Sequence, residues 1–308
     1  MSGSSTAQAC EEVQAAREEG FASAWFSNIF GLDALTGAAV AGATGAAGAP
    51  PGTEGESGAA IEIGTFVVPI YTRHPLTMAQ QAIAVQDACR GRFTLGIGLS
   101  HQVVIESMMG IEFVKPALTM REYVSVLMPL LKDGSVGFSG SIYNVNAMLE
   151  RPDGFSVPDV LVAALGPVML EIAGSLADGT ATWMTGPKTL KDHIIPTINS
   201  AAQKVGRRSP RIVAGLPICV TADVDSARQK AGRIFSIYGS LPSYRAMLDR
   251  EGAEGPGQVA LVGGREELTD ALEQMAQSGV TDFVAAPFGN PDETAETRSL
   301  LVGFGKSK

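Results

Sequence analysis

The chain is poor in cysteine and in aromatic residues. Of its 308 residues only three are cysteines (Cys10, Cys89 and Cys219), and only 6% are aromatic. The cysteines lie far apart and form no C-x-x-C pair, and their number is odd. This pattern argues against a disulfide framework and against a cysteine-based zinc site, so no metal is expected. A reducing compartment, the cytoplasm, is the expected location.

Long apolar runs and clustered basic residues are also absent. No stretch approaches the roughly 20 apolar residues that a membrane-spanning helix needs. The first eight residues contain no basic region followed by an apolar core, so we expect no signal peptide. The net charge is -9 and no basic patch is evident, which argues against nucleic acid as a partner.

The remaining composition is that of a globular protein, with 45% hydrophobic and 18% charged residues. This length allows two domains, but an α/β barrel of this size usually forms one. We therefore expect residues 1–308 to form a single barrel domain. Residues 44–59 are rich in Gly, Ala, Pro, Ser and Glu and are expected to be a flexible surface insertion.

Apolar segments that read as strands alternate with segments that read as helices. The strands are expected near residues 21, 61, 92, 159, 180, 211 and 281. This alternation predicts βαβ units and a parallel sheet. A (β/α)8 TIM barrel needs eight strands, and this chain starts on a helix, so the first strand would be the missing one. A doubly wound open sheet is the alternative, but its glycine fingerprint is absent from the first strand-to-helix turn.

The stretch 92–101 reads as a buried strand with a small polar cluster at its end. Apolar residues alternate with Gly96 and Gly98, so the two glycines share one face. Glycines at this spacing suggest that something approaches the backbone closely, and packing against a neighbouring strand is the simpler explanation. Ser100 and His101 follow at the strand end, where the site of a barrel is built.

His101 is the candidate catalytic residue. An imidazole with an ordinary pKa near 6.5 suits proton transfer at neutral pH. The alternative is an ordinary polar loop residue. His74, which follows another strand, is a weaker candidate, and His193 is expected to lie in mid-helix and to be solvated.

Two further strand ends carry residues that are candidates for ligand binding. Gly166 and Pro167 join a strand to a helix, and free amides at such a helix start favour a phosphate. An unoccupied tight turn explains the same pattern. Trp183 and Met184 end another strand and could line an apolar pocket, although core filling is the default.

Taken together and in order, these segments resemble the bacterial-luciferase-like superfamily, and more narrowly its coenzyme F420-dependent (deazaflavin) oxidoreductases. The resemblance covers about residues 9–290. The segments that carry it are residues 20–28, 63–69, 91–98, 164–167 and 176–180.

The resemblance implies a luciferase-like (β/α)8 barrel, commonly dimeric, that binds deazaflavin at its C-terminal mouth. It places a non-prolyl cis peptide, Phe66–Val67, against the deazaflavin ring. It also implies that Asn28 contacts the ring or the substrate. The other implied contacts are Gly98, Leu99, Ser100 and His101 for the ring, and Ala164, Leu165, Gly166 and Pro167 for the cofactor tail and phosphate.

The implied activity is hydride transfer between F420 and a small organic substrate, with His101 exchanging the coupled proton. Relatives that oxidise a sugar phosphate carry a catalytic histidine where this chain has Ser27-Asn28-Ile29, so that substrate is not expected. One alternative is an FMN-dependent luciferase-like monooxygenase. Another, suggested by the missing strand, is a non-catalytic or impaired barrel that binds cofactor or a partner chain.

Overall fold

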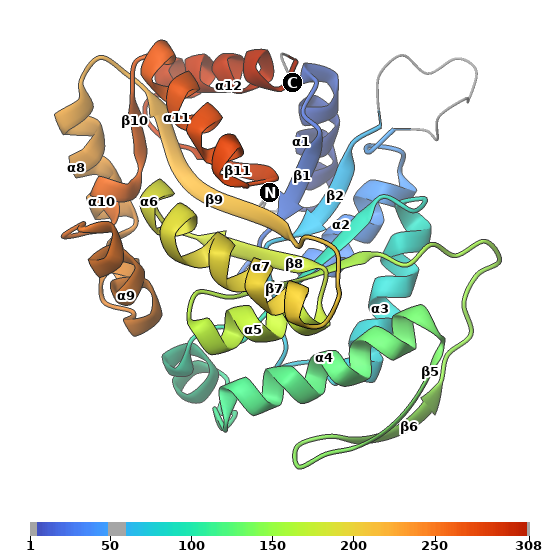
Figure 1. Cartoon of the computed structure of the whole chain (residues 1–308). Helices are drawn as coiled ribbons and strands as arrows, with labels where there is room; N and C mark the ends of the chain where they lie inside the picture. Colours follow the sequence, from blue (N-terminus) through green and yellow to red (C-terminus); the bar gives the residue numbers. More distant parts are fainter. Residues whose placement is uncertain (1–4, 49–59, 307–308) are drawn as a thin grey trace. The chain divides into compact units, whose positions relative to one another are not determined.

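The computed structural model describes residues 5–48 and 60–306 (Figure 1). They form two compact units. The first extends to Ala163 and includes Leu176–Asp178, and the second comprises Ala164–Ser175 and the chain from Gly179 onward. The single-domain organisation stays a prediction. Most of the predicted insertion, residues 49–59, lies outside the described residues, whereas residues 44–48 form turns in which Ala46 and Ala47 are buried.

The first unit opens on helix α1 (Thr6–Glu19), as expected. The helix begins at Thr6 because the Ser5 side chain accepts a hydrogen bond from the Gln8 amide. It ends at Gly20, whose φ of 98° lies in the left-handed region that glycine adopts easily. Among the described residues, the first strand therefore comes after this helix.

Four parallel strands form the sheet of the first unit. They are β1 (Ser23–Phe26), β2 (Glu62–Thr65), β4 (Phe93–Gly98) and β7 (Asp159–Ala163), paired in that order, and the short β3 (Val68–Pro69) pairs with the end of β4. Every residue of β4 is buried, as expected for a strand covered on both faces. The connecting helical segments are α2 (Ala34–Ala43), α3 (Pro75–Ala88), η1 (Val104–Met108) and α4 (Pro116–Lys132).

An antiparallel hairpin follows α4 and depends on one buried carboxylate. The hairpin comprises β5 (Ser135–Ser139) and β6 (Asn144–Met148). Glu122 of α4 is only 6% exposed and accepts hydrogen bonds of 2.8–2.9 Å from three amides of the turn, those of residues 141–143. Burial acts to raise the pKa of Glu122, but these hydrogen bonds outweigh it and lower the pKa below its usual value.

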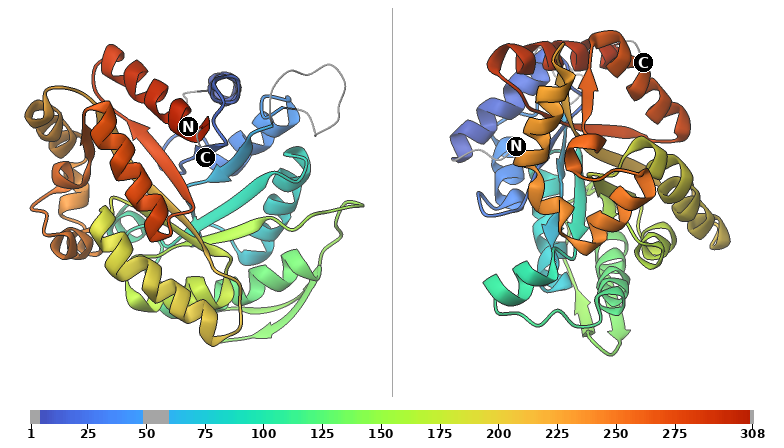
Figure 2. Two further views of the ribbon diagram at one scale, coloured as in Figure 1. Left: turned by 45° about the horizontal axis from the view of Figure 1, so that its top comes forward. Right: turned by 90° about the vertical axis from the view of Figure 1, so that its left-hand side faces the viewer.

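The second unit is built around a central strand, β9 (Arg211–Val220). Strand β8 (Gly179–Trp183) pairs with its first half and β10 (Leu261–Gly263) with its last residues, while β11 (Asp282–Pro287) pairs along the opposite edge. Arg211 and Asp282 join β9 to β11 by a bidentate ion pair of 2.5 and 2.9 Å. Helix α12 (Pro291–Lys306) packs against β9 and β11, and α11 (Arg265–Ser278) packs against β10 and α12 (Figure 2).

The remaining helices of the second unit include one π-helical turn and one 3-10 turn. The helical stretch from Pro187 to Lys204 is divided into α6 (Pro187–Thr189), the π-helical turn η2 (Leu190–Ile194) and α7 (Ile195–Lys204). Pro196, which has no amide proton to donate, lies in the first turn of α7. The other segments are α5 (Pro167–Leu176), α8 (Val224–Ile234), η3 (Ser236–Gly239), α9 (Pro242–Glu251) and α10 (Pro256–Val259).

The seven principal parallel strands thus occur at the seven predicted positions. The sequence did not predict β3 and β10, which have only two and three residues. Among the described residues, no helix is long and apolar enough to cross a membrane.

The Glu122 carboxylate gives the first testable prediction. Glu122→Gln replaces one acceptor oxygen by an amide donor that faces backbone N–H groups, so we expect the free energy of unfolding at pH 7 to fall by about 2–3 kcal/mol. Because the folded-state pKa is lowered, this stabilisation is fully present above the unfolded pKa of about 4.3 and is lost as the pH falls through the folded pKa. Urea unfolding at pH 7 and at pH 3 measures the difference.

Glu150→Gln is the matched control, because Glu150 is an exposed carboxylate just beyond β6. Its effect should be small at both pH values. An equal loss in the two variants, or a Glu122→Gln effect that grows toward low pH, would contradict this role for Glu122.

Candidate functional site

The first part of the candidate site lies where β2 and β3 run beside β4. The Phe66–Val67 peptide is cis, as the resemblance implies. The regular ladder is interrupted between the Gly64–Thr94 and Val68–Ile97 pairs. The buried Thr65 hydroxyl bridges this gap: it donates to the Gly96 carbonyl and accepts from the Gly96 amide, each at 2.9 Å.

The two glycines of β4 make room for this segment. A Cβ at Gly96 would overlap the Thr65 carbonyl oxygen, and one at Gly98 would lie 2.7 Å from Cγ2 of Val67. A bulkier residue at either position would therefore collide with its neighbour. Packing accounts for the close approach at both glycines, and contact of Gly98 with a cofactor stays a prediction.

Beyond the buried strand, the chain becomes accessible over Leu99, Ser100 and His101, which are all half-buried. Ser100 has a φ of 61°, which turns the chain out of the strand. The His101 carbonyl then accepts from the amides of Val104 and Ile105 at 2.9 and 3.0 Å and starts η1.

Burial lowers the pKa of His101 below its usual value of about 6.5. The imidazole is therefore neutral at pH 7 and can accept a proton without first losing one. This is the protonation state that a general base requires.

Asn28 follows β1 and is already engaged in local structure. Its carboxamide oxygen accepts from the Ala34 amide at 3.1 Å, at the start of α2. The carboxamide NH2 is thus the part of Asn28 that suits a ligand acceptor.

Exposed apolar side chains follow strands β1 and β4, and they were not predicted from the sequence as site residues. Ile29 and Phe30 after β1 are 61% and 65% exposed, and Val103 and Met108 after β4 are 55% and 61% exposed. Large exposed apolar residues directly after parallel strands suit contact with an apolar ligand. The available signal was the placement of apolar residues in the segments that follow the two strands.

The second part of the candidate site is the turn from β7 to α5. Ala164 is buried, Leu165 and Gly166 are half-buried, and Pro167 is exposed at the start of the helix. A Cβ at Gly166 would meet no described atom within 4 Å, so this backbone faces open space. Helix α5 has ten residues, and its first amides lie beside Gly166.

The expectation that His193 is solvated was wrong. The side chain is half-buried, and its Nε2 lies 2.9 Å from the Leu165 carbonyl oxygen. The partners are 28 residues apart, and their contact depends on how α5 and the segment η2–α7 pack, which sequence spacing does not reveal. His193 thus belongs to the surroundings of the predicted phosphate turn.

Trp183 and Met184 differ in environment. Met184 is fully buried and fills the core, with a φ of 53°. Trp183 is half-buried and meets the rings of Phe235 and Tyr238 edge-on at centroid distances of 5.8 and 6.0 Å. Trp183 is therefore part of an aromatic cluster at the end of β8.

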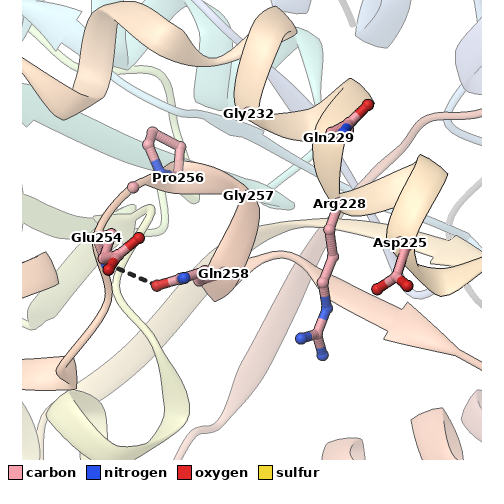
Figure 3. Close-up of a pocket in the computed structure, with 9 residues that line it drawn as sticks. Asp225, Arg228, Gln229, Gly232, Glu254, Pro256, Gly257 and Gln258 are labelled. Carbon is pink, nitrogen blue, oxygen red and sulfur yellow. Dashed lines mark hydrogen bonds between the residues drawn. The ribbon is translucent and has the colours of Figure 1, made fainter.

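An open depression of about 740 Å³ lies between α8 and α10 (Figure 3). Asp225, Arg228 and Gln229 on α8 contribute to its lining, with Glu254 and Gln258 beside them. None of the predicted site residues lines it. Ligand sites are usually enclosed, whereas this depression is open to solvent, so it is the weaker candidate.

Comparison with known proteins identifies the family. The family described as luciferase-like monooxygenases matches residues 1–297, and the chain belongs to it. Most members of the family are enzymes, and they are flavin- or deazaflavin-dependent oxidoreductases.

Among the relatives, the 5,10-methylenetetrahydromethanopterin reductase of Archaeoglobus fulgidus is 30% identical over 257 residues, covering 80% of this chain and 74% of that protein. The coenzyme F420-dependent tetrahydromethanopterin reductase of Methanopyrus kandleri superposes with a TM-score of 0.78 at 20% identity, covering 97% of this chain and 94% of the other. The oxygenating constituent of 3,6-diketocamphane monooxygenase from Pseudomonas putida, in complex with FMN, gives 0.73 at 14% identity, with 96% and 91% covered. These similarities confirm the predicted fold class, an α/β TIM-like barrel with seven parallel strands.

The Thr65 bridge gives the second prediction. Thr65→Val keeps the side-chain shape but leaves the amide and the carbonyl of Gly96 unsatisfied in a buried position. We expect the free energy of unfolding to fall by about 2–4 kcal/mol. Thr65→Ser keeps the hydroxyl and removes one methyl group, for an expected loss of about 1 kcal/mol. Chemical denaturation compares the two, and the bridge is contradicted if the serine variant is the less stable one.

Proposed function

We propose that this protein is a coenzyme F420-dependent oxidoreductase that transfers a hydride between the deazaflavin and a small organic substrate. Membership of the luciferase-like family supports the reaction class. The similarities to a methylenetetrahydromethanopterin reductase and to an F420-dependent reductase favour the deazaflavin. The observation that carries the proposal is the half-buried, neutral His101 directly after β4.

The described residues fit such a cofactor in each part of the candidate site. The chain from Leu99 to His101 leaves the buried strand and offers backbone and one titratable side chain to a ring. Gly166 and the first turn of α5 offer open backbone to a phosphate-bearing tail. When bound, the deazaflavin would supply the hydride chemistry.

His101 would hold and exchange the proton that accompanies hydride transfer. In its neutral form the imidazole accepts a proton from a substrate hydroxyl during oxidation, and the imidazolium returns it during reduction. Asn28 would bind a polar atom of the ring or substrate through its NH2 group. The exposed apolar residues Ile29, Phe30, Val103 and Met108 would contact an apolar part of the substrate.

FMN is the competing cofactor, and the similarity to the FMN-bound monooxygenase component favours it. Equilibrium binding of F420 and of FMN to the purified protein decides between the two. Tighter binding of FMN would replace the F420 proposal by a two-component monooxygenase.

The third prediction concerns His101. His101→Ala removes the proton carrier but leaves the backbone at the end of β4, so we expect turnover to fall by about 100-fold or more. The Kd of F420, measured by fluorescence titration, should change much less. Turnover is measured as the steady-state rate at which the protein reduces activated enoates with reduced F420.

The pH dependence tests the same role. Because burial lowers the pKa of His101, the imidazolium form becomes abundant only below about pH 6.5. Wild-type enoate reduction should therefore accelerate as the pH falls toward the lowered pKa, and the His101→Ala profile should lack this rise. Equal losses of turnover and affinity, or none in either, would contradict the role.

The non-catalytic alternative makes a different prediction. A barrel that only binds cofactor would be stabilised by F420 or FMN in a thermal-shift experiment but would turn over no acceptor. We also propose a homodimer, which light scattering coupled to size-exclusion chromatography tests directly.

A further inference from the structure

His193 makes a directed contact with the turn from β7 to α5. A carbonyl oxygen can only accept a hydrogen bond, so Nε2 of His193 must carry a proton and donate it to Leu165 across 2.9 Å. The catalytic proposal does not use this histidine.

The packing of the second unit holds His193 at this place. Gly174 of α5 has no side chain, and a Cβ there would lie 2.9 Å from Cβ of Ala201 on α7 and would overlap the Ile198 carbonyl. Thus the end of α5 meets α7, while Leu165, two residues before the start of α5, meets His193 on η2. The two segments run in the same direction, which brings η2 to the N-terminal end of α5.

The π-helical turn is fixed from its other end as well. Glu251 of α9 accepts from the amides of Lys188 and Thr189 at 3.1 and 2.7 Å, and from the Thr189 hydroxyl at 2.5 Å. These bonds satisfy free donors at the start of α6. His193 therefore projects from a segment anchored on both sides, by Glu251 before it and by the α5–α7 contact after it.

The consequence for the turn follows from the planarity of the peptide bond. The Leu165 carbonyl and the Gly166 amide belong to one peptide unit, and in a trans peptide they point in opposite directions. Holding the carbonyl toward His193 directs the Gly166 N–H away from it. At Gly166 a Cβ would meet no described atom within 4 Å, so this backbone is open to a ligand.

We propose that His193 is a positioning residue: by holding the Leu165 carbonyl it orients the Gly166 amide toward the phosphate of the cofactor tail. This inference rests on the proposed function, which assigns the phosphate to this turn. It adds that affinity for the phosphate depends on a side chain that does not itself touch the cofactor.

Two variants of His193 separate the effect of its hydrogen-bond donor from the effect of its ring. His193→Phe keeps a ring and removes the donor, whereas His193→Gln places an amide N–H2 at a similar reach. Lys191→Ala, an exposed residue on the same turn, is the matched control.

The first measurement needs no cofactor. Hydrogen–deuterium exchange of residues 164–170 in the free protein should be faster in His193→Phe, by about five- to tenfold, and near wild type in His193→Gln and Lys191→Ala. Unchanged exchange in His193→Phe would overturn the inference, whatever the cofactor proves to be.

The second measurement compares F420 with its phosphate-free deazaflavin fragment, and FMN with riboflavin. We use the pair whose phosphorylated compound the wild type binds. In His193→Phe the Kd of that phosphorylated compound should rise about five- to tenfold, while the Kd of its phosphate-free counterpart stays within about twofold of wild type. His193→Gln should restore most of the affinity. Equal weakening of both members would reduce His193 to a structural residue and overturn the inference.

The outcome for the wild type distinguishes the two proposals. Failure of the wild-type protein to bind either cofactor would overturn the proposed function and this inference together. Wild-type binding with no phosphate-dependent loss in His193→Phe would overturn the inference alone.

Discussion

The Thr65 hydroxyl holds together the part of the molecule on which the first half of the candidate site depends. Between β2 and β3 the backbone ladder to β4 is interrupted, and this one side chain satisfies both the amide and the carbonyl of Gly96 across the gap. Because a buried and unsatisfied peptide group is costly, the position of the following segment, Phe66 and Val67, is tied to β4. Gly96 and Gly98 then supply the space that the segment needs.

The burial of β4 determines where His101 lies. Strand β4 is buried along its whole length, and only after Gly98 does the chain become accessible. Ser100 turns the backbone out of the strand, and the His101 carbonyl anchors the next helical segment. The imidazole is therefore held at the boundary between a desolvated core and the surface, which is why its pKa is lowered although it remains half-buried.

In the second unit, another side chain holds a backbone group of a distant residue. There, His193 on η2 holds the Leu165 carbonyl in the turn that follows β7, and a Cβ at Gly166 would meet no described atom within 4 Å. In both places a side chain holds backbone groups of a residue far away in the sequence, next to a short segment at a strand end. Such segments are stable enough to present a ligand site and short enough to leave backbone groups exposed.

The sequence by itself determined the order and type of the principal elements, because a buried parallel strand and a packed helix each need a local apolar pattern. It also located the ends of β1, β4 and β7 to within one residue, and it identified Gly96 and Gly98 as positions of close approach. Tertiary structure alone decided that Thr65 bonds to Gly96, that Glu122 holds a turn about 20 residues away, and that His193 reaches Leu165. These contacts join residues 19 to 31 positions apart, and no local pattern specifies which helix or strand lies beside which. That choice follows from packing and from the need to satisfy buried polar groups, which are properties of the folded chain as a whole.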